Sequence, residues 1–344
     1  MTSFLQAEIE SQPETVARLL EAETTRVQRI VAGLPEFSYA LIAARGTSDH
    51  AATYAKYIWA SLAGYPVALA TPSLHTVYSK PPRMDGALVV AVSQSGQSPD
   101  IVAVLEEGKR QGRPTLAITN DGASPLAAMA DHVIEIHAGI ERSVAATKTY
   151  TAQLVAMALL GAGFSGNPEY VADLQGLPDA MAQTLAAKQE VTTRAERYRY
   201  MEHCVVIGRG YNYATALELS LKIKELTYVM ANAYSSADFR HGPIATVSEG
   251  MPAILLMPGG AVFDDMLDLA KDLQARGAEL LIASEHEDAA SLATTHLRIA
   301  GDLPEWLSPM VAILPGQLFA LHLALAKGYD PDKPRGLRKV TLTS

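Results

Sequence analysis

The strongest constraint on the fold of this 344-residue chain is that its second half repeats the pattern of its first. The stretch "CVVIGRGYNYATALEL" (204–219) follows the strand–turn–helix pattern of "LIAARGTSDHAATYA" (41–55), so that Arg45-Gly46 aligns with Arg209-Gly210. Further on, "PAILLMPGGAVFDDMLDLAKDLQARGAELLIAS" parallels "GALVVAVSQSGQSPDIVAVLEEGKRQGRPTLAIT". A repeat of a whole series of elements indicates two similar halves built on one architecture.

Within each half, apolar runs typical of buried strands alternate with segments of helical periodicity. In the first half we expect strands over 39–44, 87–92, 114–119 and 132–137, and helices over 48–62, 99–111 and 145–163. This alternation is typical of a parallel sheet that is covered by helices on both faces. The predicted fold class is α/β, with two tandem doubly wound, flavodoxin-like parallel-sheet halves.

Changes in composition divide the chain further. We expect an N-terminal helical segment (1–37), a first domain (38–165), a linker with a connecting helix (166–199), a second domain (200–330) and a C-terminal tail (331–344). The connecting helix is predicted over roughly 178–199, and another helix over 216–229.

Charge and composition exclude several classes of protein. The formal net charge of −9, without a long Lys/Arg block, argues against a nucleic-acid-binding surface. The N-terminus lacks the pattern of a signal peptide, and the best apolar run, 151–164, is too short for a membrane span. The single cysteine, Cys204, excludes an internal disulfide and is interpreted as an inert core thiol. We expect a cytoplasmic protein with no membrane or nucleic-acid partner.

Polar side chains follow two of the predicted strands of the first half. Four of them surround Gly96 in "SQSGQSPD", directly after the strand over 87–92: Ser93, Gln94, Ser95 and Ser98. Thr47 and Ser48 occupy the turn after the strand over 39–44. The second half has "MPGG" (257–260) in place of Ser93 to Gly96, so the fold itself does not require the hydroxyls.

Ligands of open parallel sheets bind beyond the carboxyl ends of the strands, where helix N-termini favour anions. The two polar turns therefore predict a phosphate cradle. The alternative is that Ser98 caps a helix that begins at Pro99 and that the other serines are ordinary turn residues. No "GxxxxGK[ST]" motif occurs and no "GxGxxG" follows a strand, so neither a P-loop nor a dinucleotide site is predicted.

A second candidate site lies on the helix predicted over 216–229. Glu218, Lys222 and Glu225 fall at i, i+4 and i+7, which places them on one stripe. The alternative is a solvated helix face with ordinary Glu–Lys pairs. Soon afterwards "ADFRHGP" places His241 in a tight turn, where it is a candidate general acid. No spacing of histidines supports a metal, and none is expected.

Six segments in order resemble the sugar isomerase (SIS) family, and within it the isomerase half of glucosamine-6-phosphate synthase and the stand-alone SIS deaminases. They are "RGTSDHA", "SQSGQSPD", "ERSVAATKTYTAQL", "GRGYNYATALELSLKIKELTY", "DFRHGP" and "DPDKPRGLRKVTL". The resemblance extends from about residue 38 to the end of the chain.

The resemblance implies roles for individual residues. Those implied to bind the sugar phosphate are Ser48, Ser93, Gln94, Ser95 and Ser98. Val144 lies in the segment that would line the sugar, and Arg338 replaces a small residue expected beside Lys339, where it would alter contacts with the substrate. Glu225 would move a proton between C1 and C2, and Lys339 would form an imine with the open-chain ketose. Glu218 and Lys222 match residues near that centre.

His241 matches the residue that helps to open the sugar ring, and by the same resemblance it would come from the neighbouring subunit of a homodimer. No metal or organic cofactor is implied.

The implied function is a hexosamine 6-phosphate isomerase that releases ammonia, converting glucosamine 6-phosphate to fructose 6-phosphate. "FRHGP" resembles the corresponding segment of the stand-alone deaminases more than the "LKHGP" that is usual in the synthase. No glutaminase segment is expected among the 344 residues. The alternatives are amination of fructose 6-phosphate with free or partner-supplied ammonia, plain phosphosugar isomerisation and, more remotely, phosphosugar sensing.

Overall fold

The computed structural model describes residues 3–339, and it contains two compact units. The first unit comprises residues 14–141, 148–175 and 338–339 of the described chain, and the second comprises 3–13, 142–147 and 176–337. The helical N-terminal segment is therefore shared between the units: helix α1 (Phe4–Glu10) belongs to the second and most of α2 (Gln12–Gly33) to the first.

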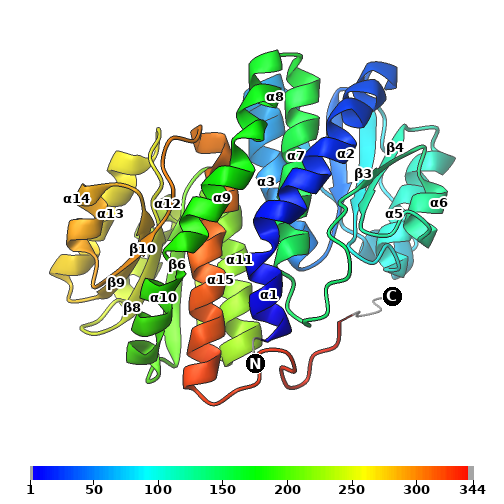
Figure 1. Cartoon of the computed structure of the whole chain (residues 1–344). Helices are drawn as coiled ribbons and strands as arrows, with labels where there is room; N and C mark the ends of the chain where they lie inside the picture. The colour runs from blue at the N-terminus through cyan, green and yellow to red at the C-terminus, as the bar shows by residue number, and fades with distance from the viewer. Residues whose placement is uncertain (1–2, 340–344) are drawn as a thin grey trace. The chain divides into compact units, whose positions relative to one another are not determined.

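The sheet of the first unit is parallel throughout, with the strand order β2-β1-β3-β4-β5 in the described residues. Figure 1 labels two of its neighbouring strands, β3 and β4. Its strands are β1 (Tyr39–Ala43), β2 (Val67–Leu69), β3 (Ala87–Val92), β4 (Thr115–Thr119) and β5 (His132–Glu135). The four strands predicted for this half are confirmed, while β2, a three-residue edge strand, was not predicted.

Helices cover both faces of this sheet. Besides most of α2, the helices of this unit are α3 (Thr47–Ala63), α4 (Ser73–Thr76), α5 (Pro99–Arg110), α6 (Pro125–Met129), α7 (Lys148–Ser165) and α8 (Pro168–Gln175), the last of which packs on α7. Alternate strand residues such as Leu41, Val89 and Ala117 pack against α5 and α6. Successive strand residues point to opposite faces of the sheet, so the residues between them face the other side. Helix α3 packs on the strands and against α7.

The sheet of the second unit has the same order once equivalent strands are matched, because β7-β6-β8-β9-β10 corresponds to β2-β1-β3-β4-β5. Its strands are β6 (His203–Gly208), β7 (Met230–Ser235), β8 (Pro252–Leu256), β9 (Glu279–Ser284) and β10 (Thr295–Arg298). The predicted duplication of a doubly wound α/β fold is thereby confirmed.

The helices of the second unit pack in the same way. They are α1, α9 (Leu177–Ala186), α10 (Lys188–Ala195), α11 (Asn212–Thr227), α12 (Ser236–Arg240), α13 (Phe263–Ala275), α14 (Glu287–Leu292) and α15 (Ser308–Ala326), with 3₁₀ turns at Glu196–Tyr198, Pro243–Thr246 and Glu305–Leu307. Side chains such as Ile207 and Leu255 pack against α12 and α13. Helix α11 lies against β6, β7 and α15, and this position buries most of it.

Helix α15 is apolar on every side. With the 3₁₀ turn before it, it is long and apolar enough to cross a membrane, but 83% of its most apolar stretch is buried inside the protein. Its composition is that of a helix surrounded by other elements, and Gly316 allows Leu219 of α11 to pack directly on its backbone.

Two predicted helices differ from the observed ones. The single helix expected over 178–199 is wrong: the chain breaks at Ala187 into α9 and α10 and ends in a 3₁₀ turn. Neither Gly nor Pro marks this break, so nothing in the local sequence predicts it. Helix α11 begins at Asn212, four residues before the predicted start. Gly208, the last residue of β6, has no side chain, and the backbone of Asn212 therefore packs directly against the end of the strand.

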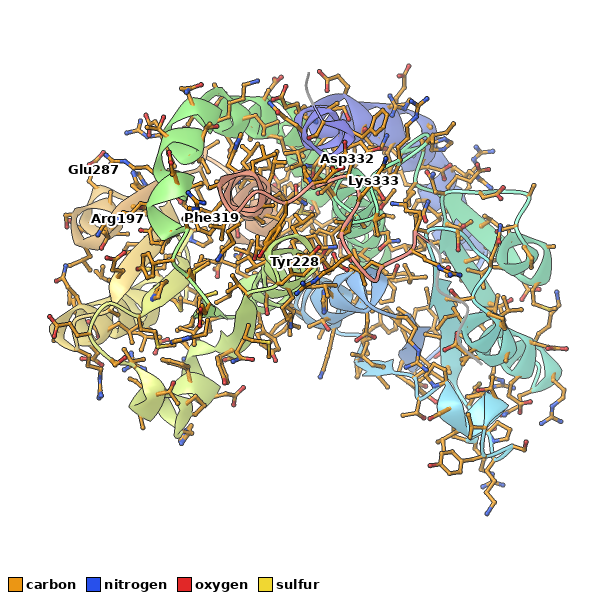
Figure 2. The ribbon with its side chains drawn as sticks, turned by 90° about the horizontal axis from the view of Figure 1, so that it is seen from below. Arg197, Tyr228, Glu287, Phe319, Asp332 and Lys333 are labelled. Atoms are coloured by element: carbon orange, nitrogen blue, oxygen red, sulfur yellow. The ribbon has the colours of Figure 1, made fainter. Side chains whose placement is uncertain are left out.

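The described part of the C-terminal tail is tied to the N-terminal helix of the same unit. Both carboxylate oxygens of Asp332 accept hydrogen bonds from the first amides of α1, those of Phe4 and Leu5, at 2.9 Å each (Figure 2). Asp332 thereby satisfies amides that the helix itself leaves without acceptors, and its charge complements the positive end of the helix dipole.

Cys204 lies in β6 and is a buried free thiol, and burial raises its pKa to about 12. At pH 8 only about one thiol in ten thousand would be ionised. We therefore expect no reaction with a disulfide reagent in the native protein and one equivalent of reaction after denaturation. Rapid reaction of the native protein would contradict this burial.

Candidate functional site

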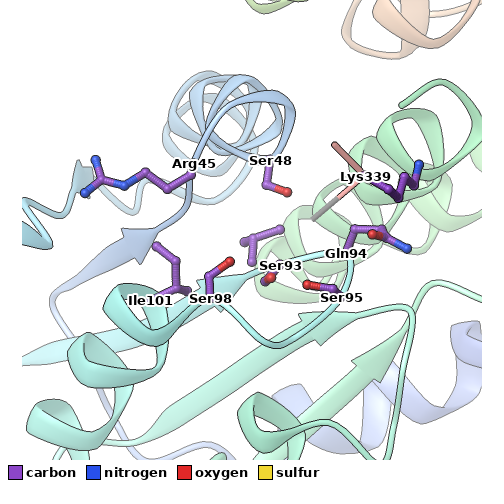
Figure 3. A pocket seen from close by; sticks show the side chains of 9 residues that line it. Arg45, Ser48, Ser93, Gln94, Ser95, Ser98, Ile101 and Lys339 are labelled. Carbon is purple, nitrogen blue, oxygen red and sulfur yellow. The ribbon is translucent and has the colours of Figure 1, made fainter. Parts of the chain in front are cut away.

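The carboxyl ends of β1 and β3 meet at the point where the strand order of the first sheet reverses, which is where open α/β sheets bind ligands. A hollow of about 140 Å³ opens there (Figure 3). It is lined by Arg45, Ser48, Val92, Ser93, Gln94, Ser95, Ser98, Ile101 and Lys339. The structure therefore brings together five of the six residues predicted to bind phosphate. Thr47, the sixth, begins α3 and is not among the lining residues.

The serine hydroxyls of the hollow already accept hydrogen bonds from the protein. Ser48 accepts one from the amide of Gln153 at 3.0 Å, Ser93 one from Gly96 N at 3.1 Å, and Ser95 one from Gln97 N at 3.3 Å. A hydroxyl that accepts in this way keeps its own hydrogen for donation to a ligand. Ser93 and Ser95 thus act as turn residues and still offer donors to an anion.

Ser98 occupies the N-cap position of α5, as predicted, but its side chain makes no capping hydrogen bond. Its hydroxyl instead borders the hollow, on the same side as those of Ser93 and Ser95 (Figure 3). The capping alternative therefore does not account for this serine.

Gly96 shapes the turn. Its φ of +61° is in the left-handed region, and a Cβ added there would lie 2.1 Å from the hydroxyl of Ser124. Only glycine fits this position, and it lets the polar turn fold tightly over the end of β3.

Arg45, which was not predicted as a site residue, lines the hollow but directs its guanidinium away from the serines (Figure 3). Its Nε donates to Asp100, a buried carboxylate at the start of α5, at 2.8 Å. The aligned pair in the second unit is Arg209 and Asp265, whose atoms lie 3.0 Å apart. Because the second unit keeps the pair without the polar turn, we interpret the pair as part of the architecture.

The corresponding turn of the second unit is filled by the chain's own carboxylates. Glu285 accepts from Gly259 N and Glu305 from Ala261 N, each at 2.8 Å. A Cβ on Gly260 would lie 2.3 Å from the carboxyl carbon of Glu305. Two backbone amides of this turn are thus already occupied by carboxylates of the protein.

Lys339 reaches the first unit from the tail. Its Nζ lies 2.6 Å from Oε2 of Glu141, a carboxylate with no exposed side-chain surface. Thr149 also donates to Glu141, from its backbone amide and its hydroxyl. Glu141 was not predicted as a site residue, although it opens the quoted segment "ERSVAATKTYTAQL".

In the second unit, the charged stripe on α11 is buried and is not a solvated face. Lys222 has 1% of its side chain exposed, and it lies 3.3 Å from Glu218 and 2.5 Å from Glu225. Burial alone would lower the pKa of Lys222, but the attraction of the two carboxylates outweighs it, so that its pKa is raised. Glu225 is the one carboxylate of this pair that keeps exposed surface, 22% of its side chain, and a ligand can therefore reach it.

The remaining predicted residues are His241, Val144 and Arg338. His241 follows α12 and is exposed, and within residues 3–339 no hydrogen bond or ion pair joins it to Glu225. Val144 is half-buried in the segment 142–147, and Arg338 is exposed. The described residues contain no group of three or more His, Cys, Asp or Glu side chains that could hold a metal ion.

Comparison with known proteins identifies the class. The SIS domain matches residues 39–162 and again 199–327, one match for each sheet, so the chain belongs to the SIS domain family. The predicted resemblance is confirmed.

Among relatives, the glutamine–fructose-6-phosphate aminotransferase (isomerizing) of Thermococcus kodakarensis is 31% identical over 98% of this chain, which spans 57% of that protein. The C-terminal domain of the glucosamine-fructose-6-phosphate aminotransferase of Francisella tularensis has a TM-score of 0.88 at 28% identity, covering 97% of this chain and 99% of that domain. A Silicibacter pomeroyi protein, provisionally named a phosphosugar isomerase, has a TM-score of 0.86 at 34% identity, covering 96% and 100%.

Replacing Ser93 and Ser95 together by alanine should weaken the binding of a sugar phosphate far more than it disturbs folding. Each hydrogen bond to a charged phosphate contributes roughly 1.5–3 kcal/mol. Calorimetric titration and a thermal melt measure the two effects, with Ser291→Ala on the exposed α14 as the control. Unchanged affinity in a folded double variant would mean that the serines are turn residues only.

Lys222→Met should destabilise the protein by about 3–5 kcal/mol at pH 7, because it removes the positive charge beside the buried Glu218. Because the pKa of Lys222 is raised by folding, its stabilising contribution is complete at neutral pH and is lost as the pH rises above about 10.5. Denaturant unfolding at pH 7 and pH 11 should therefore show a smaller difference between wild type and variant at the higher pH. Equal stability of the two proteins at pH 7 would contradict a structural role for this ammonium.

Proposed function

We propose that the protein isomerises hexosamine 6-phosphates and releases their nitrogen, so that glucosamine 6-phosphate and water give fructose 6-phosphate and ammonia. The observation that carries this proposal is the Glu218–Lys222–Glu225 group, in which a buried ammonium holds a partly exposed carboxylate. Interconversion of an aldose and a ketose needs one carboxylate that takes a proton from one carbon and returns it to the next.

Glu225 is the carboxylate proposed for this step. Its contact with Lys222 restricts the side chain, and its exposed surface leaves room for a substrate carbon. In the proposed reaction Glu225 removes the proton from C2 of the open-chain amino sugar, and the same proton is delivered to C1. Glu218 and Lys222 act by holding Glu225 in place.

The serine-lined hollow of the first unit is proposed to hold the 6-phosphate. Its hydroxyl donors supply hydrogen bonds without adding charge, and the N-terminus of α5 adds the favourable end of a helix dipole. Binding of the unreactive phosphate contributes the energy that orients the reactive end of the sugar.

Lys339 is proposed to take part in the exchange of nitrogen. After the proton transfer, the substrate nitrogen is an imine at C2. A neutral Lys339 amine adds to C2, ammonia leaves, and a lysine imine forms; its hydrolysis by water frees Lys339 and releases the ketose. The ion pair with Glu141 supports this role, because that carboxylate is placed to accept the proton that the ammonium must lose first.

His241 is proposed to assist ring opening in a homodimer, where it would come from the partner subunit. Its exposure on the surface of its own chain supports this assignment, since an exposed imidazole is accessible to a second copy. Val144 and Arg338 are proposed to contact the sugar, and Thr47 to support the turn beside the phosphate.

The names of the relatives favour a second candidate, the amination of fructose 6-phosphate. With ammonia as the nitrogen source this is the reverse of the proposed reaction, and the same residues would catalyse it. The chain spans 57% of the length of the Thermococcus kodakarensis aminotransferase.

The test is ammonia release from a panel of amino-sugar 6-phosphates. We expect release from glucosamine 6-phosphate, and a decrease in kcat of roughly 10²–10⁴ in Glu225→Gln, with phosphosugar affinity nearly unchanged, because the amide keeps the shape but cannot accept a proton. Glu285→Gln, at the filled turn of the second unit, is the matched control. Ammonia release by Glu225→Gln at the wild-type rate would remove Glu225 from the mechanism. Clear binding without ammonia from any of the sugars would favour a plain isomerase.

A further inference from the structure

Helix α11 ends at a tyrosine in an unfavourable backbone conformation. Tyr228 follows the last residue of the helix, three positions after Glu225, and has φ +59° and ψ 14°. This left-handed conformation is the usual one for the residue after a helix, but glycine normally occupies it because a Cβ there is strained. A bulky residue held in such a conformation indicates that its side chain is needed at that place.

The side chain of Tyr228 is used by the C-terminal tail. Its hydroxyl accepts a hydrogen bond from Arg335 N at 2.7 Å, and the guanidinium of Arg335 lies 4.0 Å from the centre of its ring. The ring of Tyr329 packs edge-on at 4.8 Å. Tyr228 therefore contacts the tail through a hydrogen bond, a cation–π contact and an aromatic contact.

A second anchor lies between these contacts along the chain. Asp332 binds the first amides of α1, and Figure 2 shows it beside the N-terminal helix. Residues 329–335 are thus held by the end of α11 and the start of α1, all within the second unit. Lys339 follows Arg335 by only four residues, a span of at most roughly 14 Å.

We propose that Tyr228 is a positioning residue that anchors the tail and thereby limits where Lys339 can go. The inference rests on the proposed function for the catalytic role of Lys339, but the anchoring itself does not. A residue that served only to end the helix would be replaced by glycine without loss, whereas an anchor would not.

The test compares two glycine variants. Tyr228→Gly relieves the strained backbone and removes the tail contacts, while Asp302→Gly relieves a similar conformation, φ +61°, at an exposed residue with no part in the tail. We expect both variants to fold. The melting temperature of Asp302→Gly should be at or above that of the wild type, whereas that of Tyr228→Gly should be slightly lower, because the relieved backbone strain offsets only part of the lost tail contacts. Trypsin should cleave Tyr228→Gly after Arg335 and Arg338 about tenfold faster than it cleaves the wild type, because cleavage requires the anchored segment to open. Cleavage of Asp302→Gly should proceed at the wild-type rate.

Turnover separates anchoring from a purely structural role. In Tyr228→Gly we expect kcat for ammonia release to fall by about 10²-fold, with a much smaller change in KM, since Lys339 is misplaced while the serines that line the phosphate hollow are unchanged. In Tyr228→Phe, which lacks only the hydroxyl group, kcat should fall about fivefold.

Wild-type kcat in a folded Tyr228→Gly variant would overturn the positioning role. Unchanged cleavage of the tail would overturn the anchoring. If the wild type releases no ammonia from any amino sugar, the proposed function fails, and the cleavage comparison still decides whether Tyr228 anchors the tail.

Discussion

One arginine–aspartate pair in each unit joins the turn after the first strand to the helix that follows the third. Arg45 and Asp100 do this in the first unit, and Arg209 and Asp265 do it in the second. Both turns lie at the point where the strand order reverses, so the pair fixes the two loops between which an open α/β sheet binds its ligand. Because both units keep this geometry, the residues of the loops can differ between the first unit and the second. The first unit has serines there. In the second unit the amides of Gly259 and Ala261 donate to Glu285 and Glu305.

The two units therefore share one fold but carry different functional groups. The first offers uncharged hydrogen-bond donors around a hollow, which suits a phosphate. The second buries an ammonium between two carboxylates on α11, which suits proton transfer. Burial of Lys222 is costly unless opposite charges surround it, and Glu218 and Glu225 supply those charges. The placement of α11 between the sheet and α15 is what takes these charges out of water.

The hydrophobic pattern of the sequence predicted most helices and strands correctly, because buried parallel strands and their helices have distinct periodicities. It failed where no local signal exists, as at Ala187, where the predicted long helix breaks without a Gly or Pro. It also assigned Ser98 an alternative role as a cap that its side chain does not perform. Arg45, Glu141 and Gln153 were missed as neighbours of the candidate site. The repeated Arg-Gly pairs were a visible signal for Arg45, but nothing in the spacing pairs Glu141 with Lys339 or Gln153 with Ser48, since the members of each pair are far apart in the chain.

The sequence by itself determined the duplicated α/β architecture, the polar turns at the strand ends and the common stripe of Glu218, Lys222 and Glu225. These features follow from local periodicity and from short spacings, which are written in consecutive residues. Only the tertiary structure decided that the stripe is buried, that Lys339 is paired with Glu141 and that Tyr228 and Asp332 hold the tail. Burial and long-range pairing depend on which elements pack together, and a helix stripe has the same sequence whether water or another helix covers it.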